Sequence, residues 1–162
     1  MAVKVAINGF GRIGRLVLRA MIESNRRDVE CVAINDLGSV EANAHLFRYD
    51  SVHGRFPGEV AVDGNKIIIT ANGRTYAPIT VSAERDPTKV PFQGVDVALE
   101  CTGIFVTRDK AAAHLEAGAK RVTDPVHRVE WLDKALADTL QLQDGRGGLR
   151  HWRTSGYSAP TG

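Results

Sequence analysis

Three glycines near the start of the chain have the spacing of a phosphate-binding turn. They lie in Gly9-Phe10-Gly11-Arg12-Ile13-Gly14, which matches the pattern G-x-G-x-x-G. Gly9 would permit a tight turn, Gly11 would let the backbone approach a pyrophosphate, and Gly14 would let a helix pack closely on a sheet. Glycine turns without a ligand are common, so the pattern predicts a dinucleotide site only where a strand precedes it and a helix follows it.

An acidic residue stands where such a site needs one. Asp36 follows Gly14 by 22 residues and comes directly after a strand-like run. A carboxylate there accepts hydrogen bonds from the adenosine ribose and repels the extra phosphate of NADP, so it favours NAD as the cofactor. The alternative is that Asp36 caps a helix that begins near Val40.

The segments around the glycines have the patterns that this site requires. Val3–Ile7 is a short apolar run with β-branched residues, which predicts a buried strand. Apolar residues then fall at positions 13, 16, 17, 20 and 21, the spacing of one helical face. Val29–Ile34 predicts a second strand. The unit of about 30 residues is therefore the length of a right-handed βαβ crossover, which implies a parallel sheet.

Two dipeptides, Asp63-Gly64 and Asn72-Gly73, predict hairpin turns of type I′, because both favour positive backbone φ angles. The flanking strands would be Glu59–Val62 with Lys66–Thr70, and Ile67–Ala71 with Arg74–Ala77. We expect antiparallel ribbons inserted at the edge of the sheet.

The chain then returns to the pattern of strand and helix. Val95–Glu100 predicts another buried strand, and Thr107 is expected to cap a helix with Asp109 in its first turn and Gly118 just past its end. Residues 121 and 122 would start the next strand. The predicted fold is α/β, a doubly wound, mostly parallel sheet with an antiparallel excursion.

The character of the sequence changes after Val122. Apolar residues at positions 129, 132, 136 and 140 predict an amphipathic helix within residues 123–143. Residues 144–162 contain five glycines and three arginines with almost no apolar periodicity, which predicts a flexible tail.

Composition excludes several classes of protein. The chain has 162 residues, 43% of them hydrophobic, and 21 basic against 19 acidic side chains, so its net charge of +2 indicates no nucleic-acid partner. We see no secretory signal and no membrane span of roughly 20 apolar residues, so a cytoplasmic location is the default. The two cysteines, Cys31 and Cys101, are expected to be buried reduced thiols, and the histidines lack zinc-like spacing, so we expect no metal.

Five segments occur along the chain in this order: Ile7-Asn8-Gly9-Phe10-Gly11-Arg12-Ile13-Gly14-Arg15, Ala33-Ile34-Asn35-Asp36, Tyr49-Asp50-Ser51-Val52-His53-Gly54, Glu84-Arg85-Asp86-Pro87 and Glu100-Cys101-Thr102-Gly103-Ile104-Phe105. Together they resemble the phosphorylating, type I glyceraldehyde-3-phosphate dehydrogenases over about residues 1–122. The third and fourth segments make the resemblance specific, since a dinucleotide site does not itself require them. The resemblance implies an NAD-binding Rossmann domain over residues 1–122.

The resemblance also implies roles for particular residues. Arg12 and Ile13 would offer backbone N–H groups to the pyrophosphate, Asn35 and Asp36 would face the adenosine ribose, and Arg85 would lie beside the adenine. The full set of implied cofactor-binding residues is Asn8, Gly9, Phe10, Gly11, Arg12, Ile13, Gly14, Asn35, Asp36, Arg85, Thr102, Gly103 and Phe105. Arg85 could instead be a solvated loop charge, and Phe105 could be a core residue.

The catalytic part of the family pattern is missing. The family continues after the strand at 121 with an Ile-Ser-Ala-Pro-like turn, and later with a Ser-Cys-Thr-Thr-Asn-Cys nucleophile segment and a catalytic domain, none of which follows Val122. Cys101 lies in the segment that resembles a cofactor-lining stretch, so we assign no catalytic residue. We therefore expect a truncated chain that binds NAD and cannot alone oxidise and phosphorylate glyceraldehyde 3-phosphate in glycolysis.

Two interpretations of the sequence after Val122 remain open. It could result from a change of reading frame, or it could be a real, divergent tail. The alternative function is a non-catalytic interaction module whose tail binds a partner. A homo-oligomer and a companion catalytic chain are the other possible partners.

Overall fold

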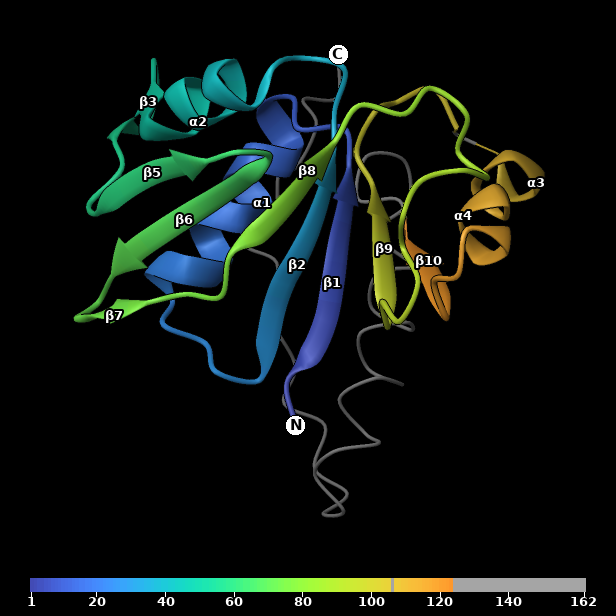
Figure 1. Cartoon of the computed structure of the whole chain (residues 1–162), viewed down its shortest axis with the longest axis horizontal. Helices are drawn as coiled ribbons and strands as arrows, with labels where there is room; N and C mark the ends of the chain where they lie inside the picture. The colour runs from blue at the N-terminus through green and yellow to red at the C-terminus, as the bar shows by residue number, and fades with distance from the viewer. Residues whose placement is uncertain (106, 124–162) are drawn as a thin grey trace, which may run out of the picture.

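The first three elements form the predicted βαβ unit. The computed structural model describes residues 1–105 and 107–123. β1 (Val3–Asn8) is followed by α1 (Arg12–Glu23) and β2 (Val29–Asn35). β1 and β2 pair in parallel from Val3↔Val29 to Asn8↔Asn35. The predicted order of strand, glycine turn, helix and strand is confirmed, and α1 lies behind β6 and β8 in Figure 1.

The remaining elements complete a mixed sheet. They are α2 (Val40–Arg48), β3 (Tyr49–Asp50), β4 (Gly54–Arg55), β5 (Glu59–Asp63), β6 (Lys66–Ala71), β7 (Arg74–Thr75), β8 (Ile79–Ser82), β9 (Val97–Glu100), α3 (Arg108–Ala111), α4 (Ala113–Glu116) and β10 (Arg121–Thr123). The strand order is β10-β9-β1-β2-β8-β6-β5, with β7 beside β6. The first five strands in this order are parallel, whereas β6 runs antiparallel to β5, β7 and β8. The fold is Rossmann-like α/β, and its antiparallel ribbons form one edge, as predicted.

Both faces of the parallel strands are buried. Ile7 of β1 packs in one cluster with Leu18 and Ile22 of α1. Ala6, the next residue toward the N-terminus, packs on the opposite side in a second cluster that includes Phe92. Because neighbouring residues of a strand point to opposite faces, β1 contributes to both halves of the core, as expected of a doubly wound sheet.

The buried face of α1 differs from the predicted one. Gly14, Leu18 and Ile22 are its buried positions together with Arg19, whereas Ile13 is 39% exposed and Ala20 is exposed. A Cβ on Gly14 would lie 2.3 Å from the carbonyl oxygen of Gly9. Because of this close approach, Gly14, Leu18 and Ile22 face the sheet. The predicted face, positions 13, 16, 17, 20 and 21, lies at the margin of the contact between helix and sheet.

One of the two predicted hairpin turns is correct in type. Asn72 and Gly73 both have positive φ, 54° and 72°, as a type I′ turn requires. In the other hairpin Asp63 pairs with Lys66, so the turn consists of Gly64 and Asn65. Gly64 has a φ of 56° and Asn65 has no positive φ. The prediction of type I′ at Asp63-Gly64 was therefore wrong, because the strand pairing extends one residue further than the dipeptide suggests.

The segment after β9 is helical in two short pieces. The N–H of Lys110 donates to the Thr107 hydroxyl at 3.4 Å, which confirms the predicted cap, and Gly118 has a φ of 106° just past the end of α4. The predicted single helix is divided at Ala112 between α3 and α4. β10 confirms the strand predicted at residues 121 and 122. The predicted helix within 123–143, apart from Thr123, and the predicted tail at 144–162 lie outside the described residues.

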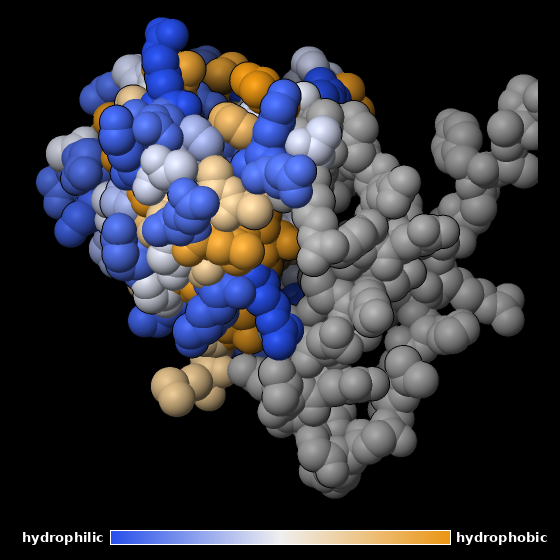
Figure 2. All heavy atoms as spheres, turned by 90° about the vertical axis from the view of Figure 1, so that its right-hand side faces the viewer, coloured by the Kyte–Doolittle hydropathy of each residue, from blue (hydrophilic) through white to orange (hydrophobic). Residues whose placement is uncertain are grey.

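The described helices contain no segment long and apolar enough to cross a membrane. Apolar surface is nevertheless exposed on the side of the molecule that carries α3, α4 and β10, where it lies among polar side chains (Figure 2). Ile104 and Leu115 are 66% and 47% exposed, respectively.

Candidate functional site

The carboxyl ends of three neighbouring strands bring the predicted site residues together. Asn8 at the end of β1 pairs with Asn35 at the end of β2 and with Glu100 at the end of β9. The glycine turn follows the first strand, Asp36 follows the second, and Thr102 and Gly103 follow the third. Ligands of open α/β sheets bind outside the carboxyl ends of the strands, so the predicted cofactor residues share the edge where a ligand is expected.

The three glycines of the turn have three different surroundings. Gly9 has a φ of +88°, and a Cβ there would lie 2.8 Å from the backbone nitrogen of Thr102. Gly14 touches the turn itself, as described above. Gly11 has an ordinary φ of −67°, and a Cβ there would meet nothing within 4 Å. Gly11 is therefore required neither by the backbone nor by packing against the described residues.

The N-terminus of α1 faces this open space without a cap. Among the described residues no side chain caps the helix at Gly11, and its first turn contains no acidic residue. The first N–H groups of a helix have no partner inside the helix and carry partial positive charge. The backbone of Arg12 and Ile13 thus offers donors to an anion, and a Cβ on Gly11 would meet nothing within 4 Å beside these donors.

A hairpin stands beside the start of α1. The guanidinium of Arg12 lies 3.8 Å from the Asp50 carboxylate. Backbone N–H groups of His53 and Val52 hold the pKa of the Asp50 carboxyl well below its usual range. The buried guanidinium of Arg19 fastens this region to α1, because it donates to the carbonyl oxygens of Phe47, Arg48 and Gly54.

Asp36 is attached to the glycine turn. Its carboxylate accepts hydrogen bonds from the backbone N–H of Phe10 and of Gly38, both at 2.8 Å. The N-cap of α2 is Ser39, whose hydroxyl accepts from the N–H of Ala42 at 3.1 Å. The alternative in which Asp36 caps this helix is therefore wrong. The carboxylate lies at the carboxyl edge of the sheet next to the turn, where a ribose hydroxyl would be expected.

Asn35 and Asn8 use their side chains inside the protein. The Asn35 amide donates to the Asn8 side-chain oxygen and to the Glu84 carbonyl, both at 2.8 Å. Its own oxygen accepts from the Ser82 hydroxyl and from the N–H of Glu84. An amide side chain offers two donor hydrogens and one acceptor oxygen with two lone pairs, so all four positions are filled. Asn35 can support the site, but its side chain has no hydrogen-bonding position left for a ribose.

The other predicted residues line the same edge in different ways. Gly103 is exposed with a φ of 71°, and Thr102 is half-buried. Phe105 is also half-buried, with its ring edge toward His114 at 5.9 Å between centroids, so it combines a packing contact with partial exposure. Arg85 is exposed. It follows Glu84, which is hydrogen-bonded to Asn35.

Sequence reasoning missed two residues at the centre of this edge. Glu100 and His114 are 1% and 0% exposed, and His114 Nε2 lies 2.6 Å from Glu100 Oε2. Burial raises the pKa of Glu100, but hydrogen bonds from His114, Thr102 and Asn8 outweigh it and lower that pKa below the usual value. A glutamate inside the apolar run Val97–Glu100 is the one signal that could have revealed this group, because a buried carboxylate needs partners.

Both cysteines are free and buried, as predicted. Burial raises the pKa of the Cys31 thiol to about 12, so this thiol is protonated near neutral pH and is a poor nucleophile. The backbone N–H of Cys101 donates to the carbonyl of Asn8 at 2.7 Å, which places this residue within the strand pairing. Among the described residues no group of three or more His, Cys, Asp or Glu side chains is arranged to hold a metal ion.

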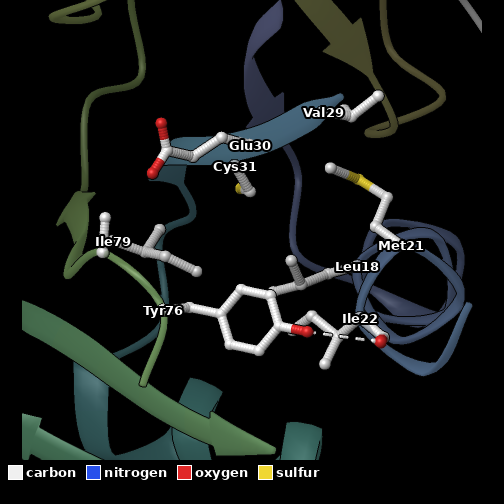
Figure 3. A pocket seen from close by; sticks show the side chains of 9 residues that line it. Leu18, Met21, Ile22, Val29, Glu30, Cys31, Tyr76 and Ile79 are labelled. Atoms are coloured by element: carbon white, nitrogen blue, oxygen red, sulfur yellow. Dashed lines mark hydrogen bonds between the residues drawn. The ribbon is translucent and has the colours of Figure 1, made fainter. Parts of the chain in front are cut away.

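A separate apolar pocket lies at the opposite end of the strands. It is a cavity of about 20 Å³ lined by α1, by the start of β2 and by Tyr76, whose hydroxyl donates to the carbonyl of Ile22 at 3.4 Å (Figure 3). A space of this size has room for about one water molecule. It is neither large enough for a nucleotide nor near the glycine turn.

Comparison with known proteins gives the chain's relatives. Residues 3–108 match the sequence model of the family described as glyceraldehyde 3-phosphate dehydrogenase, NAD binding domain. The chain is 70% identical over 124 residues to glyceraldehyde-3-phosphate dehydrogenase of Xanthobacter flavus, which covers 75% of this chain and 36% of that protein. It is 62% identical over 122 residues to the protein of the same name from Cereibacter sphaeroides, covering 75% of this chain and 35% of that protein. Over 124 residues it is 56% identical to glyceraldehyde-3-phosphate dehydrogenase 1 of Bacillus subtilis, again covering 75% of this chain and 35% of that protein. The chain spans about a third of the length of these curated relatives.

Proposed function

The chain belongs to the family of glyceraldehyde 3-phosphate dehydrogenase NAD-binding domains, and we propose that it binds NAD across the carboxyl ends of β1, β2 and β9. The observation that carries this proposal is the open, uncapped N-terminus of α1 at Gly11. A helix end without a side-chain cap and with room for a phosphate is suited to a dinucleotide.

We assign the predicted residues to two groups. The proposed surface for the cofactor consists of the backbone of Gly9, Phe10, Gly11, Arg12, Ile13 and Gly14, together with Asp36, Thr102, Gly103, Phe105 and Arg85. Asn8 and Asn35 support this surface from inside the protein, because the Asn35 amide donates a hydrogen bond to the Asn8 side-chain oxygen. When bound, NAD would supply hydride-transfer chemistry, and the chain itself would supply binding and orientation.

Calorimetric titration with NAD and with NADP tests the proposal. We expect NAD to bind more tightly, because the Asp36 carboxylate repels the additional phosphate of NADP. Equal affinity for the two dinucleotides would contradict the role of Asp36. Absence of heat and of any thermal stabilisation with either dinucleotide would contradict the proposed function itself.

We propose that a polypeptide of these 162 residues does not itself oxidise and phosphorylate glyceraldehyde 3-phosphate. Its two cysteines are buried, and a covalent mechanism needs an accessible, activated nucleophile. We expect no NADH formation from substrate, phosphate and NAD with a preparation free of host enzyme. Turnover that survives repurification and disappears in Cys101→Ser would overturn this prediction and make Cys101 the nucleophile.

Partners and location are proposals as well. The exposed apolar side chains of Ile104 and Leu115 favour association with a second copy or with a companion catalytic chain, and the same surface suits the alternative function as an interaction module. A dehydrogenase assay and a pull-down with and without residues 123–162 distinguish the family's function from this interaction module. Two free cysteines fit a reducing compartment such as the cytoplasm.

A further inference from the structure

A buried carboxylate connects the two walls of the proposed cofactor site. Oε2 of Glu100 accepts from the Asn8 amide at 2.7 Å and faces His114 Nε2 at 2.6 Å. Oε1 accepts from the backbone N–H of Thr102 at 2.8 Å and from the Thr102 hydroxyl. One wall is the glycine turn, which follows Asn8, and the other is the loop that begins at Thr102.

The position of the imidazole proton follows from these contacts. An ionised carboxylate only accepts hydrogen bonds, so the 2.6 Å contact requires that Nε2 of His114 carries a hydrogen. The Asn8 amide nitrogen lies 3.3 Å from the same Nε2. Because both nitrogens are then donors, they do not hydrogen-bond to each other. Both donors converge on one carboxylate oxygen, and this arrangement keeps Oε1 free for Thr102.

The two walls are in close contact. A Cβ on Gly9 would lie 2.7 Å from the Thr102 side chain and 2.8 Å from the Thr102 nitrogen. The Cys101 N–H also donates to the Asn8 carbonyl at 2.7 Å. A small shift of Thr102 would therefore displace the glycine turn as well.

We propose that His114 and Glu100 are positioning residues for NAD: the His114 imidazole orients the Glu100 carboxylate, and this carboxylate holds Thr102 against the glycine turn. This inference rests on the proposed function. His114 itself is fully buried and its ring contacts the rings of Phe92 and Phe105, so it acts through Glu100 and Thr102 rather than by touching the cofactor. The essential feature is a donor at Nε2.

The test compares His114→Phe, which removes the donor, with His114→Gln, which keeps an amide N–H close to the same place. His45→Phe is the matched control. His45 is an exposed residue of α2, and its ring contacts Tyr49 rather than the Glu100 carboxylate. We measure the NAD dissociation constant by calorimetry and, without NAD, the amide ¹H–¹⁵N signals of Thr102 and Gly103. Glu100→Gln serves as a second variant if His114→Phe does not fold, because it removes the charge of the carboxylate that accepts from both His114 and Thr102.

We expect His114→Phe, or Glu100→Gln in its place, to weaken NAD binding about tenfold and to move the two amide signals. His114→Gln and His45→Phe should leave both properties near those of the unmodified chain. Unmoved amide signals in His114→Phe or Glu100→Gln, or equal affinity in all variants, would overturn the positioning role. Failure of the unmodified chain to bind NAD would instead refute the proposed function, and the amide signals would still decide whether His114 positions the loop.

Discussion

The first two helices start at the same edge of the sheet but differ in how the free N–H groups at their N-termini are treated. α2 is capped by the Ser39 hydroxyl and has Glu41 in its first turn, so its own residues satisfy and neutralise the N-terminus. α1 begins at Gly11 with neither feature. A side-chain cap contributes about 1 kcal/mol to stability. The helix that lacks a side-chain cap therefore leaves its first N–H groups available for the proposed ligand.

The comparison also separates two uses of glycine. Gly38, just before the cap of α2, has the side chains of Asp36 and Asn43 within 3.4 Å of where a Cβ would be, whereas Gly11 has nothing within 4 Å. Space beside a capped helix is filled by the protein. Space beside the uncapped helix is left open, and this difference can be tested at three positions.

The largest effect should come from Gly11→Val. The backbone φ of −67° suits valine, and a Cβ at this position meets nothing within 4 Å, so folding should persist. It would occupy the space that the pyrophosphate needs, and we expect NAD affinity to fall by about a hundredfold, or about 2.7 kcal/mol. Calorimetry with NAD measures the loss.

The control for this variant is its thermal melt without cofactor. A melting temperature close to that of the unmodified chain, together with lost binding, assigns the effect to the ligand. If Gly11→Val bound NAD as tightly as the unmodified chain, the contrast between the two helices would have no functional meaning.

A smaller effect is expected at Asp36, which contacts the turn before α1. Asp36→Ala removes the acceptor for the Phe10 and Gly38 N–H groups together with the charge, and should weaken NAD binding about tenfold. Asp36→Asn keeps one acceptor oxygen without the charge. It should narrow the preference for NAD over NADP while holding the turn better than alanine does. An unchanged ratio of NAD to NADP affinity in both variants would remove Asp36 from the discrimination.

The smallest effect should come from Ser39→Ala at the capped helix. Loss of the hydrogen bond to the Ala42 N–H should lower the free energy of unfolding by about 1 kcal/mol. NAD affinity should not change. Denaturant unfolding measures the first and calorimetry the second, with Ser24→Ala as the control, because the Ser24 hydroxyl donates to a carbonyl at the end of α1 and not to a helix N-terminus. A drop in NAD affinity for Ser39→Ala alone would show that both helix starts serve the cofactor.

The local parts of the site were accessible from the sequence. The glycine spacing, the strand before it and the acidic residue after β2 are features of short stretches, and the structure confirms the elements that position them. The rotation of α1 was not accessible, because it depends on the contact of Gly14 with Gly9, which forms only when the helix docks on the sheet.

Long-range pairs were equally hidden. Glu100 and His114 are 14 residues apart and belong to a strand and a short helix, and neither side chain is part of a recognisable spacing. Their link to Asn8 joins residues 92 positions apart. Hydrogen-bond networks of this kind arise from topology, so residue patterns in one segment cannot reveal them.

The place of β1 in the middle of the sheet sets an order of events during synthesis on the ribosome. β1 pairs with β2 soon after it emerges, but its other neighbour, β9, begins 92 residues after Val5. At roughly 5 to 20 residues per second, one edge of β1 waits for about 5 to 20 s before its partner is made. Thr102, which packs against Gly9 of the glycine turn, emerges just after that strand. A nascent chain can therefore form its first βαβ unit early, but it completes the proposed dinucleotide site only after β9 has left the ribosome. Until then β1 is an open edge for chaperones or for another nascent chain.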